Sequence, residues 1–547
     1  MDYTKLRARY EVLKSEKSSI EEVFVLIEQY ILPFRGYFNG SVESNNQVQW
    51  RRREIYDGTA VLGAQTLASN LHSNLTNPIL QWFNIITKNK ELNRLNAVKV
   101  WLEDCTTLIY QVLQASNFEL QVNETYLDLV GFGTAIILEE AHETPDGKLD
   151  NLEFTTIPIE ECVFETDHRE RLCGLYRRLN WTPGQIIEKF GYDNVPDRIR
   201  EADANPQHST VRMGVLFAIY RRREIDLQWA ASHRVLPPES RPYAAEYYLM
   251  DDGTPLEIGG YYEMPAFAPR WRKASGSNWG FSQGMVCLSD VLTLNKFTEL
   301  GIKVGEKCLD PPALIKRRGV LGNVDLQAGG ATVVDDMANV QYLKYEGRFD
   351  VSRTTTADLK LAIEKAFFVD QLQLKESPAM TATEVQVRYQ LMQRLLGPSL
   401  GRLQNDFLDP LIERTFRILF RYGLIPDPPQ ELVQSGAEFE IEYIGPMARA
   451  QRFDSVASIE RWMQNVAQMA SIFPQALDVP NVDEVVKELG YAAGVPAKLV
   501  QSDAAILLAR IQKQKQMEQQ QQMEMAQGAG QAIKTMGEGV KALSAAQ

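Results

Sequence analysis

Two glycine-rich segments have a spacing that could bind a phosphate group. GFGTAI at residues 131–136 resembles the start of the dinucleotide-binding GxGxxG pattern, but Ile136 replaces the third glycine and a predicted helix precedes the segment. GAGQAIKT at residues 528–535 is one residue short of a P-loop, Ile533 replaces the glycine before Lys534, and no predicted strand precedes it. We therefore interpret the first segment as a helix-terminating glycine pair and reject the second as a nucleotide site.

Cysteine, histidine and acidic residues do not gather into a metal site or a catalytic group. The five cysteines are scattered without a CxxC pair, and no two of the five histidines lie within four residues of each other, whereas a zinc site needs clustered ligands. With 71 acidic residues, neighbours such as Asp335 and Asp336 arise by chance and are interpreted as solvent-facing. We find no nucleophile or general base. The sequence thus predicts no enzyme, with no catalytic or metal residues and no cofactor.

Positive charge is concentrated in four short runs of a chain whose formal net charge is −13. The runs are Arg51–Arg53, Arg177-Arg178, Arg221–Arg223 and Lys316–Arg318. They could be solvated or paired with the abundant acids; alternatively, they could contact a neighbouring subunit, a partner protein or DNA phosphate. The acidic net charge excludes a protein that wraps nucleic acid tightly, because that affinity comes from neutralising phosphates. It is compatible with a conduit along which DNA slides.

Length and composition indicate a large globular protein. A chain of 547 residues predicts two to four folded units, and 44% hydrophobic with 24% charged residues is ordinary for a globular protein. No apolar run approaches the ~20 residues of a membrane span. The charged N-terminal segment lacks the apolar region of a secretion signal, so we expect a cytoplasm-like compartment.

The first half of the chain alternates between helical and β-rich segments. An amphipathic helix is expected to end at Pro33, and a helical stretch is expected over about 94–130. Between them, a helix carries small residues along one stripe, which predicts burial against a neighbouring backbone; the stripe is Ala60, Gly63, Ala64, Leu67, Ala68 and Leu71. Residues 150–270 show short strands and turns, a mainly β insertion in a helical protein.

The middle of the chain reads as two helices that flank a small lobe. Residues 280–306 are helical, residues 311–350 form a small β-type lobe, and a second helix starts near Thr354–Thr356. After a break at residues 375–384, a long helix is expected to run to about residue 423.

Within the break, Thr381 and Glu384 have the spacing of a capping box, which marks the start of that long helix. Pro398 and Pro410 should each bend it, because proline removes a backbone hydrogen bond. A strand, EFEIEYIGP, then leads into helices from 447 to about 510, and the tail is rich in Gln, Met and Ala.

Four segments carry distinctive motifs in a fixed order between residues 50 and 455. They are YDGTAVLGAQTLASNLHSNLTNP with Trp82-Phe83; PRWRKASGSNWGFSQGMVCLSDVLTLNK, through Arg270, Trp271, Gly280, Gly284, Leu288, Asp290, Leu294 and Asn295; Met380–Val385 followed by LLGPSLGRLQNDFLDPLIERTFRILFRYGLIP; and IEYIGPMARAQR at 441–452. In combination they resemble the head-to-tail connector (portal) family of short-tailed bacteriophages, of the podovirus type. This chain has Trp279-Gly280 where that family commonly has Tyr-Gly, and residues 456–547 carry no recognised motif.

The resemblance implies an α+β, mainly helical portal fold that assembles as a ring, usually of twelve subunits. It divides the chain into a wing at 1–280, with the β-rich insertion at 134–270, a stem helix at 281–307, a clip at 308–353, a second stem helix at 354–373, a tunnel loop at 374–383, a long bent wing helix and strand at 384–455, and a crown at 456–547 with a Gln-rich, partly flexible tail.

The resemblance also implies candidate site residues. Those of the tunnel loop, facing the DNA channel, are Lys375, Glu376, Ser377, Met380 and Thr381. The clip contributes Lys316, Arg317 and Arg318 as candidates for docking an adaptor or the packaging ATPase. We further hypothesise that much of the negative charge of the ring faces the channel, where salt limits its reach to ~8 Å.

The implied function is a DNA channel at one capsid vertex, in the virion, assembled in the cytoplasm of a bacterial host. It would serve genome packaging, DNA retention, tail attachment and genome ejection. Its implied partners are further copies of itself, double-stranded DNA, the major capsid and scaffolding proteins, the packaging terminase ATPase and tail adaptor proteins. The alternatives are another virion structural component, such as a tail adaptor or tube protein, and a packaging enzyme.

Overall fold

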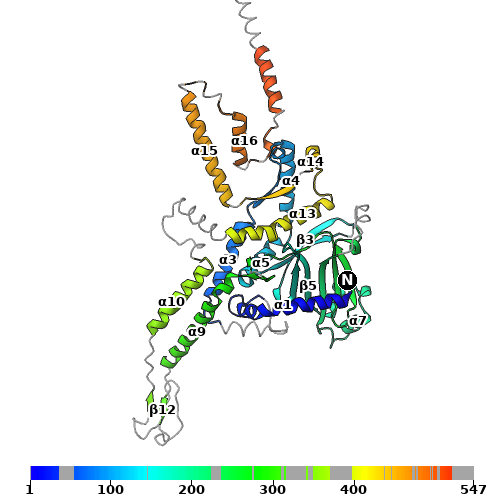
Figure 1. The fold of residues 1–547 in the computed structure, drawn as a ribbon, viewed down its shortest axis with the longest axis vertical. Coiled ribbons are helices and arrows are strands. Elements are labelled where there is room, and N and C mark those ends of the chain that lie inside the picture. Colours follow the sequence, from blue (N-terminus) through cyan, green and yellow to red (C-terminus); the bar gives the residue numbers. More distant parts are fainter. Residues whose placement is uncertain are drawn as a thin grey trace, which may run out of the picture. The chain divides into compact units, whose positions relative to one another are not determined.

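The computed structural model describes residues 2–35, 55–144, 146–222, 236–273, 276–309, 313–315, 340–342, 349–369 and, with short gaps, 397–519. The chain divides into two compact units. Unit 1 comprises Met1–Trp82 and Ile109–Leu424, and unit 2 comprises Phe83–Leu108 and Ile425–Gln547. Both helices and strands are present throughout (Figure 1), so the fold is α+β.

A five-stranded antiparallel sheet with the order β4-β5-β6-β7-β8 forms one part of unit 1. Its strands are Cys162–Thr166 (β4), Leu172–Trp181 (β5), Met213–Arg221 (β6), Tyr243–Leu249 (β7) and Pro255–Tyr261 (β8). Helix α1 (Tyr3–Tyr30) lies along one face and buries Leu6, Tyr10 and Leu13 against it. The buried Lys17 ammonium fixes the helix to the start of β4, donating to the Ile159 carbonyl at 2.6 Å.

Two short helices interrupt the β-rich segment between β5 and β6, which the sequence had not led us to expect, and the first of them contacts the other face of the sheet. They are α6 (Pro183–Phe190) and α7 (Asp197–Ala204). Helix α6 starts with a capping box in which the Thr182 hydroxyl accepts from the Gln185 backbone N–H. Phe190 of α6 packs edge-on against Tyr247 of β7. The strands of the sheet center are therefore buried on both sides, which explains their continuous apolar sequences.

A second, three-stranded sheet has the order β3-β2-β9, with β2 at Ile136–Glu143, β3 at Leu149–Ile157 and β9 at Ala266–Phe267. Two-residue strands β10 (Arg272–Lys273) and β11 (Gly280–Phe281) pair nearby in the sequence. Gly147, in the connection between β2 and β3, adopts a positive φ of 74°.

Helix α3 (Thr59–Leu75) buries the stripe of small residues that the sequence predicted, Ala60, Gly63, Ala64, Leu67, Ala68 and Leu71, together with Leu75. It packs against α5 (Phe118–Phe132). A Cβ atom on Gly63 would stand 2.8 Å from the Phe367 ring. The small residues thus allow the close approach of other parts of unit 1.

The helical stretch expected over about 94–130 is present as two helices with a break between them, α4 (Asn96–Ala115) and α5. Asn117 at the break hydrogen-bonds a strand instead of continuing a helix. Its amide nitrogen donates to the Phe154 carbonyl at 2.8 Å, and its oxygen accepts from the Phe154 N–H at 2.7 Å. At the far end of α5, Gly133 is a left-handed C-cap with a φ of 80°, which confirms the helix-terminating interpretation of this segment.

The helix preceding Pro410 changes its winding at the proline. Residues 397–403 are α-helical, Gln404–Leu408 forms a π-helix (η6), and α13 covers Asp409–Arg421. Proline lacks the N–H that would continue an α-helical ladder, and the wider π turn lies directly before it. The predicted start of this helix at Glu384 lies outside the described residues.

Unit 2 is built on a two-stranded antiparallel pair, β1 (Phe83–Thr87) with β14 (Phe439–Tyr443). The indole of Trp101, on α4, stacks on Phe439 and donates its N–H to the Pro426 carbonyl at 2.8 Å. The other helices of this unit are α14 (Gln430–Ser435), α15 (Pro446–Ala470), α16 (Val482–Ala492) and a helical stretch at 505–519. Residues 83–108, grouped by sequence with the wing, thus fold together with the C-terminal residues.

Candidate functional site

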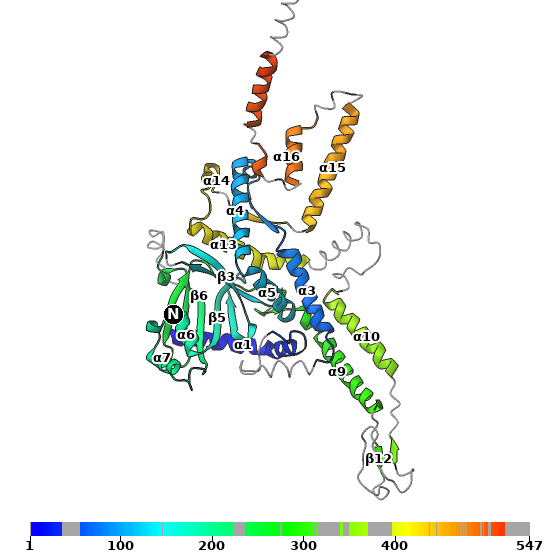
Figure 2. The ribbon, with the colours of Figure 1, turned by 180° about the vertical axis from the view of Figure 1, so that it is seen from behind.

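A two-helix hairpin is the most distinctive feature of unit 1. Helices α9 (Gln283–Leu309) and α10 (Phe349–Ala366) run side by side in both views (Figures 1 and 2). The connection between them contains an antiparallel pair of three-residue strands, β12 (Ala313–Ile315) and β13 (Val340–Tyr342). The helix–lobe–helix order expected from the sequence is present, although α10 starts at Phe349, five residues before the expected Thr354.

The start of α9 is fixed to the end of α5 through direct hydrogen bonds. The Ser282 hydroxyl donates to the Gly131 carbonyl at 2.6 Å, and the Gly280 N–H donates to the Thr134 hydroxyl at 2.7 Å. All these atoms are buried, where a hydrogen bond costs most to lose. The hairpin therefore starts from a fixed position on the core of unit 1.

Two polar contacts attach the hairpin to the segment before α3. The Asn295 side-chain oxygen of α9 accepts from the Tyr56 N–H at 2.7 Å, and Lys360 of α10 pairs with Asp57 at 2.7 Å. Burial opposes ionisation of Asp57, but hydrogen bonds from Lys360 and Thr59 outweigh it and lower the pKa of this carboxyl. Each helix of the hairpin thus has its own anchor.

Helix α9 carries two separate apolar faces. The first, formed by Cys287, Val291 and Leu294, is buried within the chain. The second is exposed, with Val286 59%, Phe297 39% and Leu300 46% accessible. At 100° per residue these three side chains share one stripe of the helix, away from the buried face. A contiguous apolar stripe that is exposed to water marks a surface that a partner covers.

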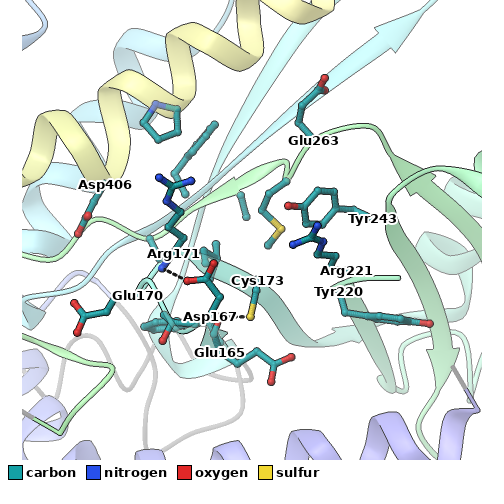
Figure 3. A pocket seen from close by; sticks show the side chains of 18 of the residues that line it. Glu165, Asp167, Glu170, Arg171, Cys173, Tyr220, Arg221, Tyr243, Glu263 and Asp406 are labelled. Carbon is teal, nitrogen blue, oxygen red and sulfur yellow. Dashed lines mark hydrogen bonds between the residues drawn. The ribbon is translucent and has the colours of Figure 1, made fainter. Parts of the chain in front are cut away.

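A charged cavity of about 1150 Å³ lies elsewhere in unit 1, between the five-stranded sheet and the η6–α13 segment (Figure 3). Its polar lining mixes basic and acidic side chains, among them Arg171, Arg221, Arg270, Glu263, Asp406 and Arg414. The sequence alone does not bring these residues together. It singled out Arg270 as part of a family motif and Arg221 as part of a basic run.

Arg414, which lines this cavity, also forms a buried ion pair that joins α13 to Glu139 of β2. Glu139 is fully buried and Arg414 is 5% exposed, with 3.1 Å between Arg414 Nε and Glu139 Oε2. The geometry at this pair of atoms is not that of a hydrogen bond. Two hydrogen bonds connect the same elements. The Thr415 hydroxyl donates to Glu139 Oε1 at 2.9 Å, and Arg414 Nη2 donates to the Glu139 backbone carbonyl at 3.1 Å. Burial raises the pKa of Glu139 to about 7, against the opposing attraction of Arg414.

All the candidate site residues taken from the resemblance lie outside the described residues. They are Lys316, Arg317 and Arg318 of the expected clip, and Lys375, Glu376, Ser377, Met380, Thr381 and Glu384 of the expected tunnel loop and helix cap. Their roles remain predictions.

Two of the four basic runs lie at least partly in the described chain. Arg177 pairs with Glu161 at 2.8 Å. Arg222 donates to the carbonyl oxygens of Arg241 and Gly259, at 2.6 and 2.9 Å. Arg177 is therefore paired with an acid, as one of the two interpretations expected. Arg222 instead bonds backbone carbonyl groups, which neither interpretation foresaw. Arg221 lines the cavity.

Metal-ligating side chains do not come together in the part of the chain that the structure describes, where no group of three or more His, Cys, Asp or Glu residues could hold an ion. The same described residues contain no helix with the length and apolar character needed to span a membrane.

Comparison with known proteins gives the family. The family model for the bacteriophage head to tail connecting protein matches residues 3–500. The chain therefore belongs to the family of bacteriophage head to tail connecting proteins, a family of structural connectors.

Two curated relatives extend over nearly the whole chain. A "Probable portal protein" of Bordetella phage BPP-1 is 28% identical over 523 residues, covering 93% of this chain and 90% of the relative. A "Portal protein" of Salmonella phage epsilon15 is 25% identical over 548 residues, covering 96% of this chain and 94% of the relative. The resemblance seen in the sequence motifs is thus confirmed.

Proposed function

We propose that this chain is the portal subunit of a bacteriophage, and that copies of it form a ring with a DNA channel at one capsid vertex. The channel admits the genome during packaging, retains it, and releases it through the attached tail. Family membership and the two portal relatives support this function. We propose a mechanical role without catalysis.

The second apolar face of α9 is the structural observation that carries the proposal. Val286, Phe297 and Leu300 are exposed in the single chain, although another face of the same helix is already buried. In a ring, each α9–α10 hairpin has one neighbour on either side, so a second face is required in addition to the face that contacts its own chain. Fully burying an exposed side chain of this size contributes roughly 1.5–3 kcal/mol, and Leu300, which is 46% exposed, would contribute part of that.

The parts of the chain are assigned on this basis. Helices α9 and α10 correspond to the two stem helices, and the β12–β13 pair belongs to the clip. We assign residues 374–383 to a tunnel loop that projects into the channel, with Lys375 as a transient phosphate contact. The basic clip residues Lys316–Arg318 dock an adaptor or the packaging ATPase. The C-terminal residues 456–547 form a crown.

The partners follow from this role. The ring holds double-stranded DNA, sits among the major capsid and scaffolding proteins, docks the terminase ATPase during filling and later binds tail adaptor proteins. Its place is the portal vertex of the virion, after assembly in the cytoplasm of the bacterial host. Twelve subunits are the number that the family implies.

Negative-stain images of the purified full-length chain test the proposal. We expect rings with a central hole wide enough for a DNA duplex and a single rotational symmetry. A chain that stays a compact monomer under all assembly conditions, or that stacks into long tubes as a tail-tube protein does, would contradict it. ATP hydrolysis by the pure protein would instead favour the packaging-enzyme alternative.

A further inference from the structure

The charged cavity of unit 1 contains a buried arginine whose hydrogen-bonding capacity is only partly used. The Arg270 side chain is 6% exposed and lines the cavity. Its Nη2 donates to the Glu170 carbonyl at 3.0 Å and contacts Asp406 Oδ2 at 3.2 Å. Its Nε and Nη1 atoms are buried and have no hydrogen-bond partner. Leaving a buried N–H donor of a charged group without an acceptor costs free energy. These two N–H groups therefore indicate that an acceptor binds here.

Charged groups of both signs surround Arg270. Three cations act on the Glu170 carboxylate, namely Lys273, Arg270 and Arg402. Asp406, on the π-helical η6 segment, is a further acid on which Arg270 and Arg402 act. Arg402 also has a buried nitrogen, Nη1, without a partner. Two neighbouring arginines therefore have buried N–H groups that could donate to an added acceptor.

A second arginine is positioned to close over such an anion. Arg171 follows Glu170 directly in the β4–β5 turn, and Arg270 is bonded to the carbonyl group between them. The Arg171 backbone N–H is held by the Asp167 carboxylate at 2.9 Å, which fixes the turn. Figure 3 shows the Arg171 side chain pointing into the cavity. Arg171 is exposed, and its positive charge helps to lower the pKa of the Asp167 carboxyl. One arginine is thus buried and pre-positioned, and the other can move.

We propose that Arg270 and Arg171 form a binding site for an oxyanion, a carboxylate or a phosphate, in this cavity. Two guanidinium groups with planar N–H forks match the geometry of a carboxylate or phosphate, because each can donate two parallel hydrogen bonds to such a group. The oxyanion supplies the acceptor for Arg270 Nε and Nη1. Two sources have this chemistry: free inorganic phosphate, and an acidic side chain of a second copy of this chain. The site itself does not depend on the proposed portal function.

Calorimetric titration of the full-length, unassembled chain with inorganic phosphate, at constant ionic strength in chloride buffer, tests the site. We expect saturable binding to one site. Arg270→Lys keeps the charge but loses the fork, and Arg171→Gln removes the exposed partner without touching a buried group. Each should weaken phosphate binding about tenfold or more, the loss expected from one hydrogen bond to a charged group.

Arg169→Gln is the matched control, because Arg169 is exposed in the same turn but does not line the cavity. It should bind phosphate as the wild type does. No binding to the wild type, or equal binding by the wild type and both site variants, overturns the proposal. If Arg270→Lys fails to fold, Arg171→Gln alone decides.

The source of the oxyanion is distinguished by repeating the titration on assembled protein. If phosphate also binds the assembled chains, the free ion is the ligand. If phosphate binds only unassembled chains, and the two site variants assemble at least tenfold less well than Arg169→Gln, a carboxylate of a second copy occupies the site. Both results support the site. Loss of phosphate binding on assembly with unimpaired assembly of both variants overturns the assignment to a second copy.

Discussion

A Cβ atom on Gly280 would stand 2.1 Å from the carbonyl oxygen of Gly133. The two glycines come from motifs that lie far apart in the sequence, the GFG segment at the end of α5 and the Trp-Gly pair before α9. Their close approach lets the hydrogen bonds at Thr134 and Ser282 form. The glycine pair therefore sets the position from which the α9–α10 hairpin starts.

Gly280→Ala should destabilise the chain by roughly 3 kcal/mol, because the added methyl group meets backbone, which cannot rotate away as a side chain can. Gly301→Ala is the matched control: no atom lies within 4 Å of its Cβ position. Alanine there should instead stabilise α9 by up to about 1 kcal/mol. Urea unfolding of the unassembled variants measures both. Equal free energies of unfolding for Gly280→Ala and Gly301→Ala would show that the close approach of Gly280 to Gly133 does not contribute to stability.

The buried carboxyl of Glu139 predicts a pH dependence of stability. Its pKa is raised from 4.5 to about 7 by burial. The folded chain then binds this proton more tightly than the unfolded chain, so stability from this group is present below about pH 4.5 and is lost as the pH rises towards 7. Since a pKa unit corresponds to 1.36 kcal/mol, Glu139→Gln should gain roughly 2–3 kcal/mol relative to the wild type between these pH values.

The control for this comparison is Glu413→Gln, which changes an exposed carboxyl that pairs with Arg417 on the surface of α13. Its stability relative to the wild type should vary little over the same range, because surface pairs contribute little. If the wild type instead gained stability over Glu139→Gln as the pH rose, the Arg414 attraction would outweigh burial.

Local patterns in the sequence were enough for several elements of the fold. The buried side of α3 could be predicted residue by residue, because helical periodicity alone selects it, and the end of α5 follows from its glycines. The break between α4 and α5 could not. It depends on Asn117 bonding to Phe154, 37 residues further along the chain. Helix α6 is different, since the Thr182–Gln185 capping box was present in the sequence and was overlooked.

The cavity could not be predicted at all. Arg270 and Asp406 are 136 residues apart, and each is an ordinary charged residue in its local sequence. Only the folded structure places them together. It also shows that Arg270 Nε and Nη1 are buried without a hydrogen-bond partner, which the sequence does not reveal. The family resemblance selected Arg270 and Trp271 as a motif without giving a physical reason for the arginine.

The exposed stripe on α9 predicts the effect of a charge in the proposed subunit contact. Leu300→Asp should raise the protein concentration needed for ring assembly at least about tenfold, because it removes apolar burial and adds a charge that must be desolvated. The monomer should keep its circular dichroism spectrum, since Leu300 is 46% exposed there. Lys303→Ala changes the net charge by the same amount on another face and should assemble normally. Normal assembly of Leu300→Asp would show that this stripe of α9 does not lie in the interface between subunits.

The basic residues of the expected clip predict a defect in attachment. Replacing Lys316, Arg317 and Arg318 by glutamate should leave rings intact and reduce tail attachment at least about a hundredfold, because like charges across a docking surface cost several kcal/mol. Replacing three exposed lysines outside the clip, Lys189, Lys513 and Lys515, by glutamate controls for the equal change in overall charge. Counting tailed particles by electron microscopy measures the effect. Full tailing of the clip variant would exclude these residues as a docking site.

Lys375 provides the sharpest test of the expected tunnel loop. The loop is proposed to touch passing DNA, and an ammonium group is the side chain in it that can pair with a phosphate. Removing one hydrogen bond to a charged group weakens a contact about tenfold, so phages with Lys375→Ala should package less DNA per unit time or leak genomes about tenfold more often. Lys189→Ala, which removes an exposed lysine from α6, should have no effect on either quantity. A variant with normal rings, normal packaging and normal retention would show that DNA passes this loop without using its charge.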